Sequence, residues 1–302
     1  MALASFALRA KPLLGAALQV RSDFSLGYLA ARACPAAVVS IAIGIVTGIA
    51  RLAIPGGNDF SWHLRAARHL IAGAEIYNDS LASDPYHHVP YPLPAAFLAL
   101  PFAWLRDDLA AAAFFGASAA IIAWCLIRAG EAWRLSIFLS WQFLNALFNA
   151  QSAPLLLCLY FLPSALPLVL VKPNIAIPMV LTQFPSKHGL ALTLAISLTS
   201  LALYPTWPLI WFGQLGSYRG VSPISVLPFG PLIVLALLRW QNREAWLLIL
   251  MAVMPQRMVY DQIPLLLTAR TPRQLLLLVE CSWIWILPTL LFNSNFYAAW
   301  PQ

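Results

Sequence analysis

The sequence predicts an all-α fold, a polytopic transmembrane helical bundle, and its composition is the main reason. The chain has 302 residues, of which 61% are hydrophobic and 10% are charged, and its mean hydropathy is +0.76. Soluble domains typically carry about 25% charged residues. So few charges do not cover the surface of a water-soluble protein, so we expect the bilayer to be the solvent. Spanning helices satisfy their own backbone hydrogen bonds, and the period-two alternation of barrel strands is missing.

The N-terminal segment, residues 1–33, precedes the first long apolar run and carries Arg9, Lys11, Arg21 and Arg32. Basic residues accumulate on the cytoplasmic side of membrane proteins, so we expect this segment to be cytoplasmic or interfacial. A first span of about Cys34–Ile54 then makes the loop at 55–92 extracytoplasmic. We expect residues 1–302 to form a single integral membrane domain.

The loop at 55–92 is the longest polar interval of the chain. Within it, residues 59–72 predict a short helix, which Asn58 or Asp59 begins and Gly73 ends. One face of this helix is apolar, with Phe60, Leu64, Ala67 and Ile71 at helical spacing. The polar residues lie away from that face, namely His63, Arg65, Arg68 and His69. This pattern is typical of an amphipathic helix in the membrane interface.

The remaining apolar segments predict further spans, which brings the count to about nine to twelve, some of them broken. Pro163 and Pro167 interrupt one of them. The clearer spans are Leu93–Leu105, Leu109–Ile127, Trp133–Phe148, Pro154–Val171, Ser225–Leu238, Trp246–Met254 and Leu275–Phe292. Counting from a cytoplasmic N-terminus places five cations inside, as the positive-inside rule requires: Lys187, Arg239, Arg243, Arg270 and Arg273. The outer side then holds Asp59, Lys172, Arg219, Arg257 and Asp261.

Asp59 and Lys172 are the first candidates for chemistry, and each has two interpretations. Asp59 is either the N-cap of its helix or a general base within reach of a substrate hydroxyl. Lys172, between an apolar run and Pro173, either extends to the outer headgroups or serves a function inside the membrane protein.

Arg257, Tyr260 and Asp261 form a third candidate group. Arg257 and Asp261 are four residues apart, so they can pair with each other on one helical turn. The alternative is that Arg257 binds a phosphate through its several donors. The histidines of the loop, including the adjacent His87 and His88, have two interpretations. They are either metal ligands or solvated residues of the membrane interface. We favour the second interpretation and predict neither a metal site nor a cofactor.

Six motifs resemble, in order and rough spacing, the polyprenol-phosphate-mannose-dependent mannosyltransferase family of the GT-C superfamily of integral membrane glycosyltransferases. These landmarks are Asp59-Phe60, Gly73 with Tyr77, Tyr91-Pro92, Lys172-Pro173 and Tyr260-Asp261, and Gln151 matches a Gly-Gln turn of that family. The chain departs from the family pattern at Leu93, where a second proline is usual, and at Ala150, where glycine is usual.

The resemblance implies a GT-C-like fold and an inverting enzyme at the extracytoplasmic face of the cell (inner or plasma) membrane. Its donor is a sugar such as mannose on a polyprenyl phosphate, and its acceptor is an envelope glycan or glycolipid. Asp59 then serves as the catalytic base, and the donor phosphate is bound by Lys172, Arg257 and Arg219. Substrate contacts fall to Tyr91, Gln151, Asn174, Tyr260 and Asp261.

Two other functions remain open at this point. A membrane transporter or flippase is also polytopic with broken helices, but it more often shows inverted repeats and charges at mid-membrane depth. A non-catalytic scaffold for envelope assembly tolerates loss of Asp59. Nucleic acid is not an expected partner, because the net charge of +7 comes from basic residues scattered at the ends of apolar runs.

Overall fold

The computed structural model describes residues 26–54, 58–77, 91–183, 185–215, 220–256 and 258–285, apart from the side chains of residues 26–33, 214 and 285. Over these ranges every regular element is a helix, and strand-like pairing is limited to an isolated bridge between Val221 and Gln256. The all-α part of the fold prediction is therefore confirmed for the part of the chain that the structure describes.

The described elements comprise both α-helices and 3-10 segments. The α-helices are α2 (Leu26–Ala53), α3 (Phe60–Ala72), α4 (Asp107–Arg128), α5 (Trp141–Phe148), α6 (Ala153–Leu156), α7 (Pro173–Leu181), α8 (Lys187–Leu203), α9 (Trp207–Leu215), α10 (Arg243–Val253) and α11 (Pro272–Ser282). The 3-10 segments are η1 (Leu93–Leu98), η2 (Leu100–Phe102), η3 (Ala132–Leu139), η4 (Leu157–Tyr160), η5 (Pro163–Leu170), η6 (Pro223–Ser225), η7 (Gly230–Arg239), η8 (Val259–Thr268) and η9 (Trp283–Trp285).

Proline accounts for much of this fragmentation. Five of the 3-10 segments have proline in their first turn, and η5 and η8 also contain Pro167 and Pro264 internally. Proline lacks the backbone N–H and clashes with the preceding turn, so a continuous α-helix does not form across it. The predicted interruption at Pro163 and Pro167 is confirmed.

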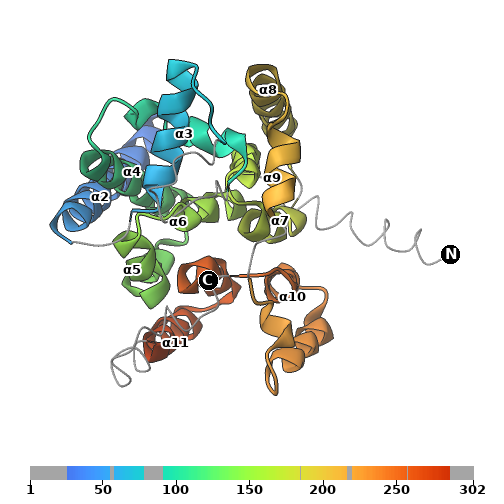
Figure 1. The fold of residues 1–302 in the computed structure, drawn as a ribbon. Coiled ribbons are helices and arrows are strands. Elements are labelled where there is room, and N and C mark those ends of the chain that lie inside the picture. The colour runs from blue at the N-terminus through green and yellow to red at the C-terminus, as the bar shows by residue number, and fades with distance from the viewer. Residues whose placement is uncertain are drawn as a thin grey trace. The chain divides into compact units, whose positions relative to one another are not determined.

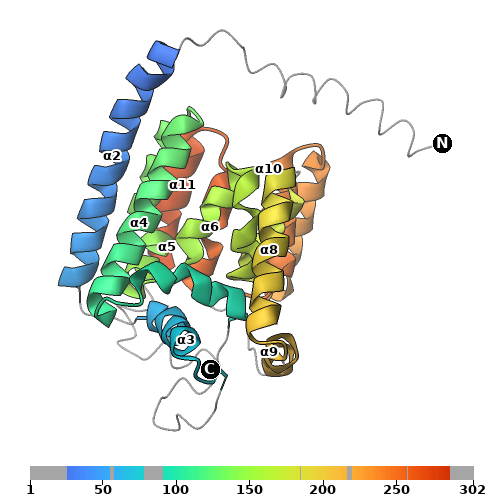
Figure 2. The same ribbon diagram turned by 90° about the horizontal axis from the view of Figure 1, so that it is seen from above.

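The chain divides into two compact units, Met1–Val38 and Val39–Gln302. Helix α2 begins in the first unit and continues into the second, and all that follows concerns the second unit. There, α4, α6, α8 and α10 run alongside one another, while α3 lies across one end of this bundle (Figures 1 and 2). The prediction of one domain over the whole chain stays a prediction.

Two described helices are long and apolar enough to cross a bilayer, namely Cys34–Ala53 and Asp107–Arg128. A third span is added if Lys187–Leu203 and Trp207–Gly213 are taken together, although they meet at a bend of 94°. The chain is therefore a candidate multi-pass membrane protein. Over the described residues, the other predicted spans form shorter α-helical and 3-10 segments, and the last of them, Leu275–Phe292, continues beyond those residues. The larger count of nine to twelve stays a prediction.

Close packing of α2 on α4 depends on glycine. A Cβ atom on Gly116 would lie 2.6 Å from the backbone oxygen of Gly44, and one on Gly44 would lie 2.8 Å from the backbone oxygen of Gly116. Small residues let two membrane helices approach at backbone distance, where dispersion forces and polar backbone contacts hold them. Beside this contact, an open apolar groove of about 470 Å³ runs between the two helices from Ile41 to Leu52 and Leu109.

The bundle has two chemically different ends. Helix α4 rises about 33 Å over its length, and Asp107 at its start accepts hydrogen bonds from Asn58 and from Arg68 of α3. At its other end, the N–H of Glu131 bonds to the carbonyl of Leu126. We call the end with Asp107 and α3 the α3 end. The opposite end, where α4 finishes at Arg128, is the arginine end.

Helix α3 is confirmed, with Gly73 in the left-handed conformation (φ 65°) at its C-terminus. It packs against α4 through the stacked rings of Phe60 and Phe114, whose centroids are 4.0 Å apart. Arg68 anchors it further, with bonds to the carbonyls of Ala103 and Leu105 and an ion pair to Asp107 at 2.7 Å.

The expected single apolar face of α3 is only partly correct. Ile71, assigned to that face, is 47% exposed, whereas Trp62, His63 and Ala66 are buried. The reason is that η1 packs on a second face of the helix and buries it. The hydrophobic pattern of one helix does not reveal which other elements pack on its remaining faces.

Candidate functional site

Asp59 stands at the start of α3, where it occupies the N-cap position without capping the helix through its side chain. Its backbone N–H instead bonds to the carbonyl of Asn149 at 2.9 Å, which joins the start of α3 to the turn after α5. Of the two interpretations of Asp59, side-chain capping is therefore wrong, and the carboxylate is available for other contacts.

Gln151 and Tyr260 hold the Asp59 carboxylate in place. The amide nitrogen of Gln151 and the hydroxyl of Tyr260 both donate to Oδ2 of Asp59, the latter at 3.2 Å, and Gln151 also bonds to the Tyr260 hydroxyl at 3.0 Å. Among the described residues, every side-chain hydrogen bond to Asp59 ends on Oδ2. Within those residues, the other carboxylate oxygen, Oδ1, accepts no side-chain hydrogen bond.

The turn that carries Gln151 needs an unusual backbone conformation. Ala150 has φ 50°, in the left-handed region that glycine adopts most easily. Here alanine takes the same conformation, so the amide of Gln151 still reaches Asp59.

Lys172 and Asp261 form a buried ion pair beside these residues. Nζ of Lys172 lies 2.6 Å from Oδ1 of Asp261, and their side chains are 11% and 1% exposed. Oδ2 of Asp261 accepts the N–H of Met258 at 3.3 Å, which fixes the start of η8. Lys172 is thus buried and not extended towards headgroups, and its function stays a prediction.

Tyr260 links the two halves of the site. Its hydroxyl bonds to Asp59, and its ring faces Lys172, whose Nζ is 4.8 Å from the ring centroid. A cation over an aromatic face is attracted by the negative face of the ring, more strongly when both are shielded from water. The predicted base and the predicted phosphate-binding cation therefore contact opposite parts of one side chain.

His63 is a member of the site that the sequence analysis missed. It was expected at the solvated face of α3, but it is 3% exposed, and its ring lies between those of Phe60 and Tyr91, with centroid distances of 5.6 and 4.5 Å. Its spacing of four residues from Asp59 places both on one side of α3, and that spacing is the signal that was available.

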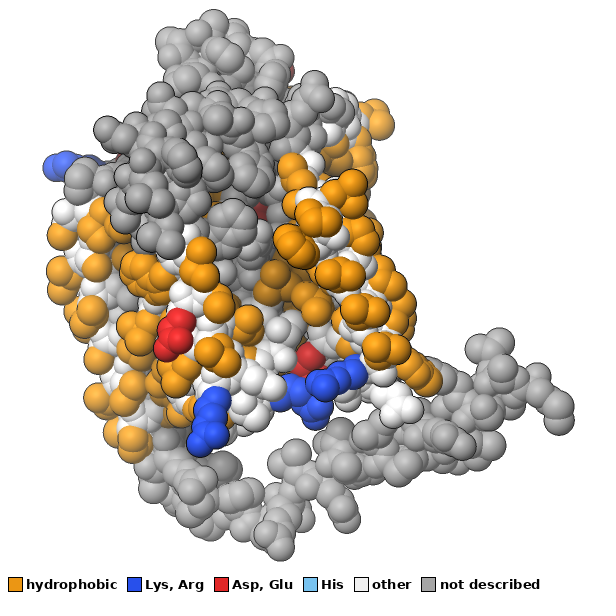
Figure 3. Space-filling view, turned by 90° about the horizontal axis from the view of Figure 1, so that it is seen from below, with side chains coloured by type: hydrophobic (Ala, Val, Ile, Leu, Met, Phe, Trp, Pro, Cys, Tyr) orange, Lys and Arg blue, Asp and Glu red, His pale blue; other side chains and the backbone are white. Residues whose placement is uncertain are grey.

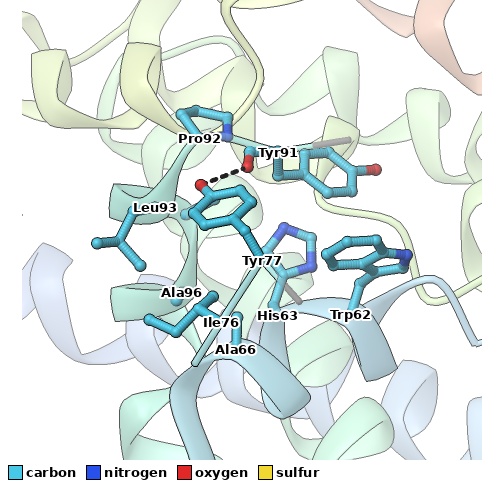
Figure 4. Close-up of a pocket in the computed structure, with 10 residues that line it drawn as sticks. Trp62, His63, Ala66, Ile76, Tyr77, Tyr91, Pro92, Leu93 and Ala96 are labelled. Carbon is cyan, nitrogen blue, oxygen red and sulfur yellow. Dashed lines mark hydrogen bonds between the residues drawn. The ribbon is translucent and has the colours of Figure 1, made fainter. Parts of the chain in front are cut away.

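The His63 ring borders a cavity of about 10 Å³, together with Trp62, Tyr77 and Tyr91 (Figure 4). That volume holds one water molecule. Neither ring nitrogen of His63 has a well-formed hydrogen bond to a described residue. Burial lowers the pKa of His63 from 6.5 to about 4, the backbone of Asp59 opposes this shift, and the charge of Lys172 adds to it.

Tyr91 closes the same side of the site. Its carbonyl accepts the hydroxyl of Tyr77 at 3.2 Å, which ties it to the end of the segment that follows α3. Loss of water around its hydroxyl raises the pKa of Tyr91, while Lys172 lowers it and Asp59 raises it. Tyr91 is therefore within electrostatic reach of both the carboxylate and the cation.

The structure brings together six of the nine residues that the sequence singled out. These are Asp59, Tyr91, Gln151, Lys172, Tyr260 and Asp261. Asn174 is close in sequence, but its amide donates to the carbonyl of Pro255 at 3.1 Å. Arg219 and Arg257 lie outside the described residues, as do His87 and His88. The described ranges contain no group of three or more His, Cys, Asp or Glu side chains arranged to hold a metal ion.

No protein-family model, curated protein or solved structure matches this chain. The resemblance to the polyprenol-phosphate-mannose-dependent mannosyltransferases rests on the ordered motifs in the sequence, and membership of that family stays a prediction.

Proposed function

We propose that this protein is an integral membrane glycosyltransferase that moves a sugar, such as mannose, from a polyprenyl phosphate to an acceptor hydroxyl. The observation that carries the proposal is the Asp59 carboxylate, held at Oδ2 by Gln151 and by Tyr260, whose ring also contacts the buried cation Lys172. A base and a cation close together are the two groups that this transfer needs.

Asp59 is the base in this scheme. A general base must lie within hydrogen-bond reach of the proton that it removes, and its own orientation must be fixed. Gln151 and Tyr260 supply that orientation through Oδ2. Oδ1 then takes the proton from the acceptor hydroxyl as its oxygen attacks the anomeric carbon.

Lys172 is the group that stabilises the leaving phosphate. As the bond between the anomeric carbon and the phosphate oxygen breaks, its electron pair leaves with the phosphate, and a nearby fixed cation stabilises that developing charge. The sugar is transferred with inversion, the proton stays on Asp59, and polyprenyl phosphate is released. The aromatic ring of Tyr260 helps to keep Nζ of Lys172 beside the reaction.

Asp261 keeps Lys172 charged and positioned before the donor arrives. A buried ammonium without a counter-ion loses its proton or leaves the interior, because charges are costly in a medium of low polarity. The contact of 2.6 Å with Asp261 meets that requirement. When a phosphate binds, Lys172 is shared between the two anions, and Arg219 and Arg257 are the predicted additional cations.

The apolar groove between α2 and α4 is where the lipid tail of the donor lies in this proposal. Its walls are purely aliphatic, and its volume of about 470 Å³ accommodates part of one chain. One end of the groove reaches Leu109, two residues from Asp107, whose carbonyl is bonded to Asn58 next to Asp59. A tail in this groove would therefore place its phosphate at the level of the candidate site.

The orientation in the membrane follows from charge. Exposed arginines at the arginine end belong on the cytoplasmic side by the positive-inside rule. The α3 end with Asp59 is then extracytoplasmic, in the inner or plasma membrane, where acceptor glycans of the envelope are found.

The test is sugar transfer in membranes that contain the wild-type chain or Asp59→Asn. This change keeps the size and the hydrogen-bonding capacity of the side chain but removes the base. With radiolabelled polyprenyl-phosphate-mannose as donor, we expect transfer by the wild type and a loss of at least about a hundredfold in the variant, a typical contribution of general base catalysis.

Asp108→Asn is the matched control, because Asp108 is an exposed carboxylate at the same end of the bundle, paired with Arg106. Its transfer rate should equal that of the wild type at equal protein level. Full activity of Asp59→Asn would remove Asp59 as the base. Absence of transfer by the wild type with this donor would contradict the proposed donor class.

A further inference from the structure

Five exposed cations share the arginine end of the molecule: Arg128, Lys187, Arg239, Arg270 and Arg273. We call them the basic surface. Arg128 ends α4, Lys187 begins α8, Arg239 ends η7, and the last two flank the start of α11.

Contacts between elements show that these positions belong to one end of the bundle. Arg134, six residues beyond the end of α4, donates to the carbonyl of Leu267, just before Arg270. Arg243 donates to the carbonyl of Tyr160. Arg134 is also close enough to Tyr160 to interact electrostatically with its hydroxyl.

Lys187 lies at the same end, as the packing of Gly189, two residues further along α8, shows. That glycine packs so closely on Pro163 that an added Cβ would collide with the proline carbonyl. Pro163 follows Tyr160 by three residues, so α8 begins beside the Tyr160 and Arg243 contact.

The basic surface is not neutralised within the described part of the chain. None of its five members forms an ion pair there. The acids nearby are already engaged, since Glu131 pairs with the buried Arg134 and Glu244 accepts the Tyr160 hydroxyl. Glu280, on α11, lies about 12 Å along the helix from its start.

The α3 end is the opposite case. There Arg68 pairs with Asp107 at 2.7 Å and Arg106 pairs with Asp108 at 3.1 Å. Among the described residues, two exposed arginines at the α3 end form ion pairs with acids, and the members of the basic surface form none. An array of unpaired cations is complementary to an anionic surface.

Aromatic and apolar side chains adjoin the basic surface. The guanidinium of Arg128 lies 5.6 Å from the ring centroid of Trp124, and Trp246 donates to the carbonyl of Trp240, next to Arg239. Leu238 is 82% exposed. Figure 3 shows Lys and Arg side chains along the edge of a largely hydrophobic face. An occupant of this region needs negative charge on one side and hydrocarbon on the other.

We propose that the basic surface binds the headgroups of anionic phospholipids, with their acyl chains along the adjoining apolar helices. Phosphate and guanidinium form bidentate hydrogen bonds, and tryptophan favours the boundary between headgroups and chains. Each cation near an anionic leaflet strengthens binding about fivefold. The inference depends on surface charge and is independent of the proposed sugar transfer.

The test measures lipid binding to the purified full-length chain in a mild detergent by native mass spectrometry. Phosphatidylglycerol, phosphatidylcholine and inorganic phosphate are the three probes. We expect phosphatidylglycerol to bind at least about twentyfold more tightly than phosphatidylcholine, and this preference to decline as salt rises from about 0.05 to 0.5 M.

Two quadruple variants separate charge from folding. Replacement by glutamine (Arg128→Gln, Arg239→Gln, Arg270→Gln and Arg273→Gln) should abolish the preference, and replacement of the same four residues by lysine should retain most of it. Arg106→Gln is the control at the opposite end and should bind as the wild type does.

Three results would overturn the proposal. Equal affinity for the two lipids would show that charge is not recognised, and an unchanged preference in the glutamine variant would place the binding elsewhere. Displacement of bound phosphatidylglycerol by millimolar inorganic phosphate would show a simple anion site with no need for a lipid.

Discussion

The hydroxyl of Tyr260 donates to the carboxylate of Asp59 at 3.2 Å, although the two residues are 201 positions apart in the chain. This bond joins the start of α3 to the start of η8, and the ring of the same tyrosine faces Lys172. The candidate base and the candidate phosphate-binding residue are therefore positioned by one side chain.

Tyr260→Phe should reduce sugar transfer about tenfold or more, because small displacements of a catalytic group are costly for the rate. The change removes one of the two donors that hold Oδ2 of Asp59 but keeps the aromatic ring under Lys172. We expect the loss in kcat, with little change in KM for the donor.

Tyr160→Phe provides the control for that substitution. It removes a tyrosine hydroxyl at the arginine end, where the partner is Glu244 at 3.4 Å. Its transfer rate should stay at the wild-type value. Unchanged kcat in Tyr260→Phe would mean that Gln151 alone is sufficient to orient Asp59.

The Lys172 and Asp261 pair should show strong energetic coupling. Lys172→Met or Asp261→Asn alone breaks the buried ion pair while keeping one of its charges, which costs about 3–5 kcal/mol of stability. The double variant removes both charges, so it should lose clearly less than the sum of the single losses. Thermal unfolding of the four proteins in detergent measures this cycle, and additive losses would contradict a direct buried pair.

His63 should make the protein less stable in mild acid. Its pKa is lowered to about 4 in the folded chain, while an unfolded chain takes up the proton near 6.5. The unfolded state therefore binds more protons between these values, and stability falls as the pH drops from about 6.5 to 4, by at most about 3 kcal/mol. The contribution of neutral His63 to the stability of the folded protein is fully present above about pH 6.5.

The measurement is the unfolding midpoint between pH 4 and 8, for the wild type and for His63→Phe. Phenylalanine fills the space between Phe60 and Tyr91 without titrating, so this variant should lose most of the pH dependence in that window. His69→Phe is the control, since His69 is only partly buried and its Nδ1 already contacts the carbonyl of Glu75 at 2.8 Å. An unchanged slope in His63→Phe would assign the acid sensitivity to other groups.

Gly116→Ala should destabilise the protein by about 1–3 kcal/mol, the usual cost of inserting a carbon into close packing. The added methyl would lie 2.6 Å from the carbonyl of Gly44, so α2 and α4 must separate. Gly213→Ala is the matched control, because a Cβ there meets nothing within 4 Å. Alanine is favoured over glycine in helices, so that control should be neutral or slightly stabilising. Equal stability of the two variants would mean that α2 and α4 adjust without cost.

Sequence and structure agree most closely where local chemistry decides the outcome. The helix predicted at residues 59–72 forms at Phe60–Ala72, since a glycine that adopts the left-handed conformation ends it. The apolar stretches at Cys34–Ile54 and Leu109–Ile127 coincide with the two long apolar helices. The proline positions also anticipate the breaks around Pro163 and Pro167.

The sequence alone indicated an all-α chain with helices apolar enough to cross a membrane, and it singled out six of the residues that the structure brings together. The hydrophobicity of a segment is a sum over neighbouring residues, and the ends of a helix depend on side chains within one turn. Both properties can therefore be predicted from the sequence. Ordered motifs likewise singled out Asp59, Gln151, Lys172 and Asp261.

Only the tertiary structure decided how these residues pair. Asp261 contacts Lys172, which is 89 positions away, whereas Arg257 lies outside the described residues. His63 was expected in solvent, yet a second element covers it. The reason is physical. Periodicity tells which face of a helix is apolar, whereas the partner of a buried charge and the covering of a second face depend on segments far apart in sequence that packing brings together.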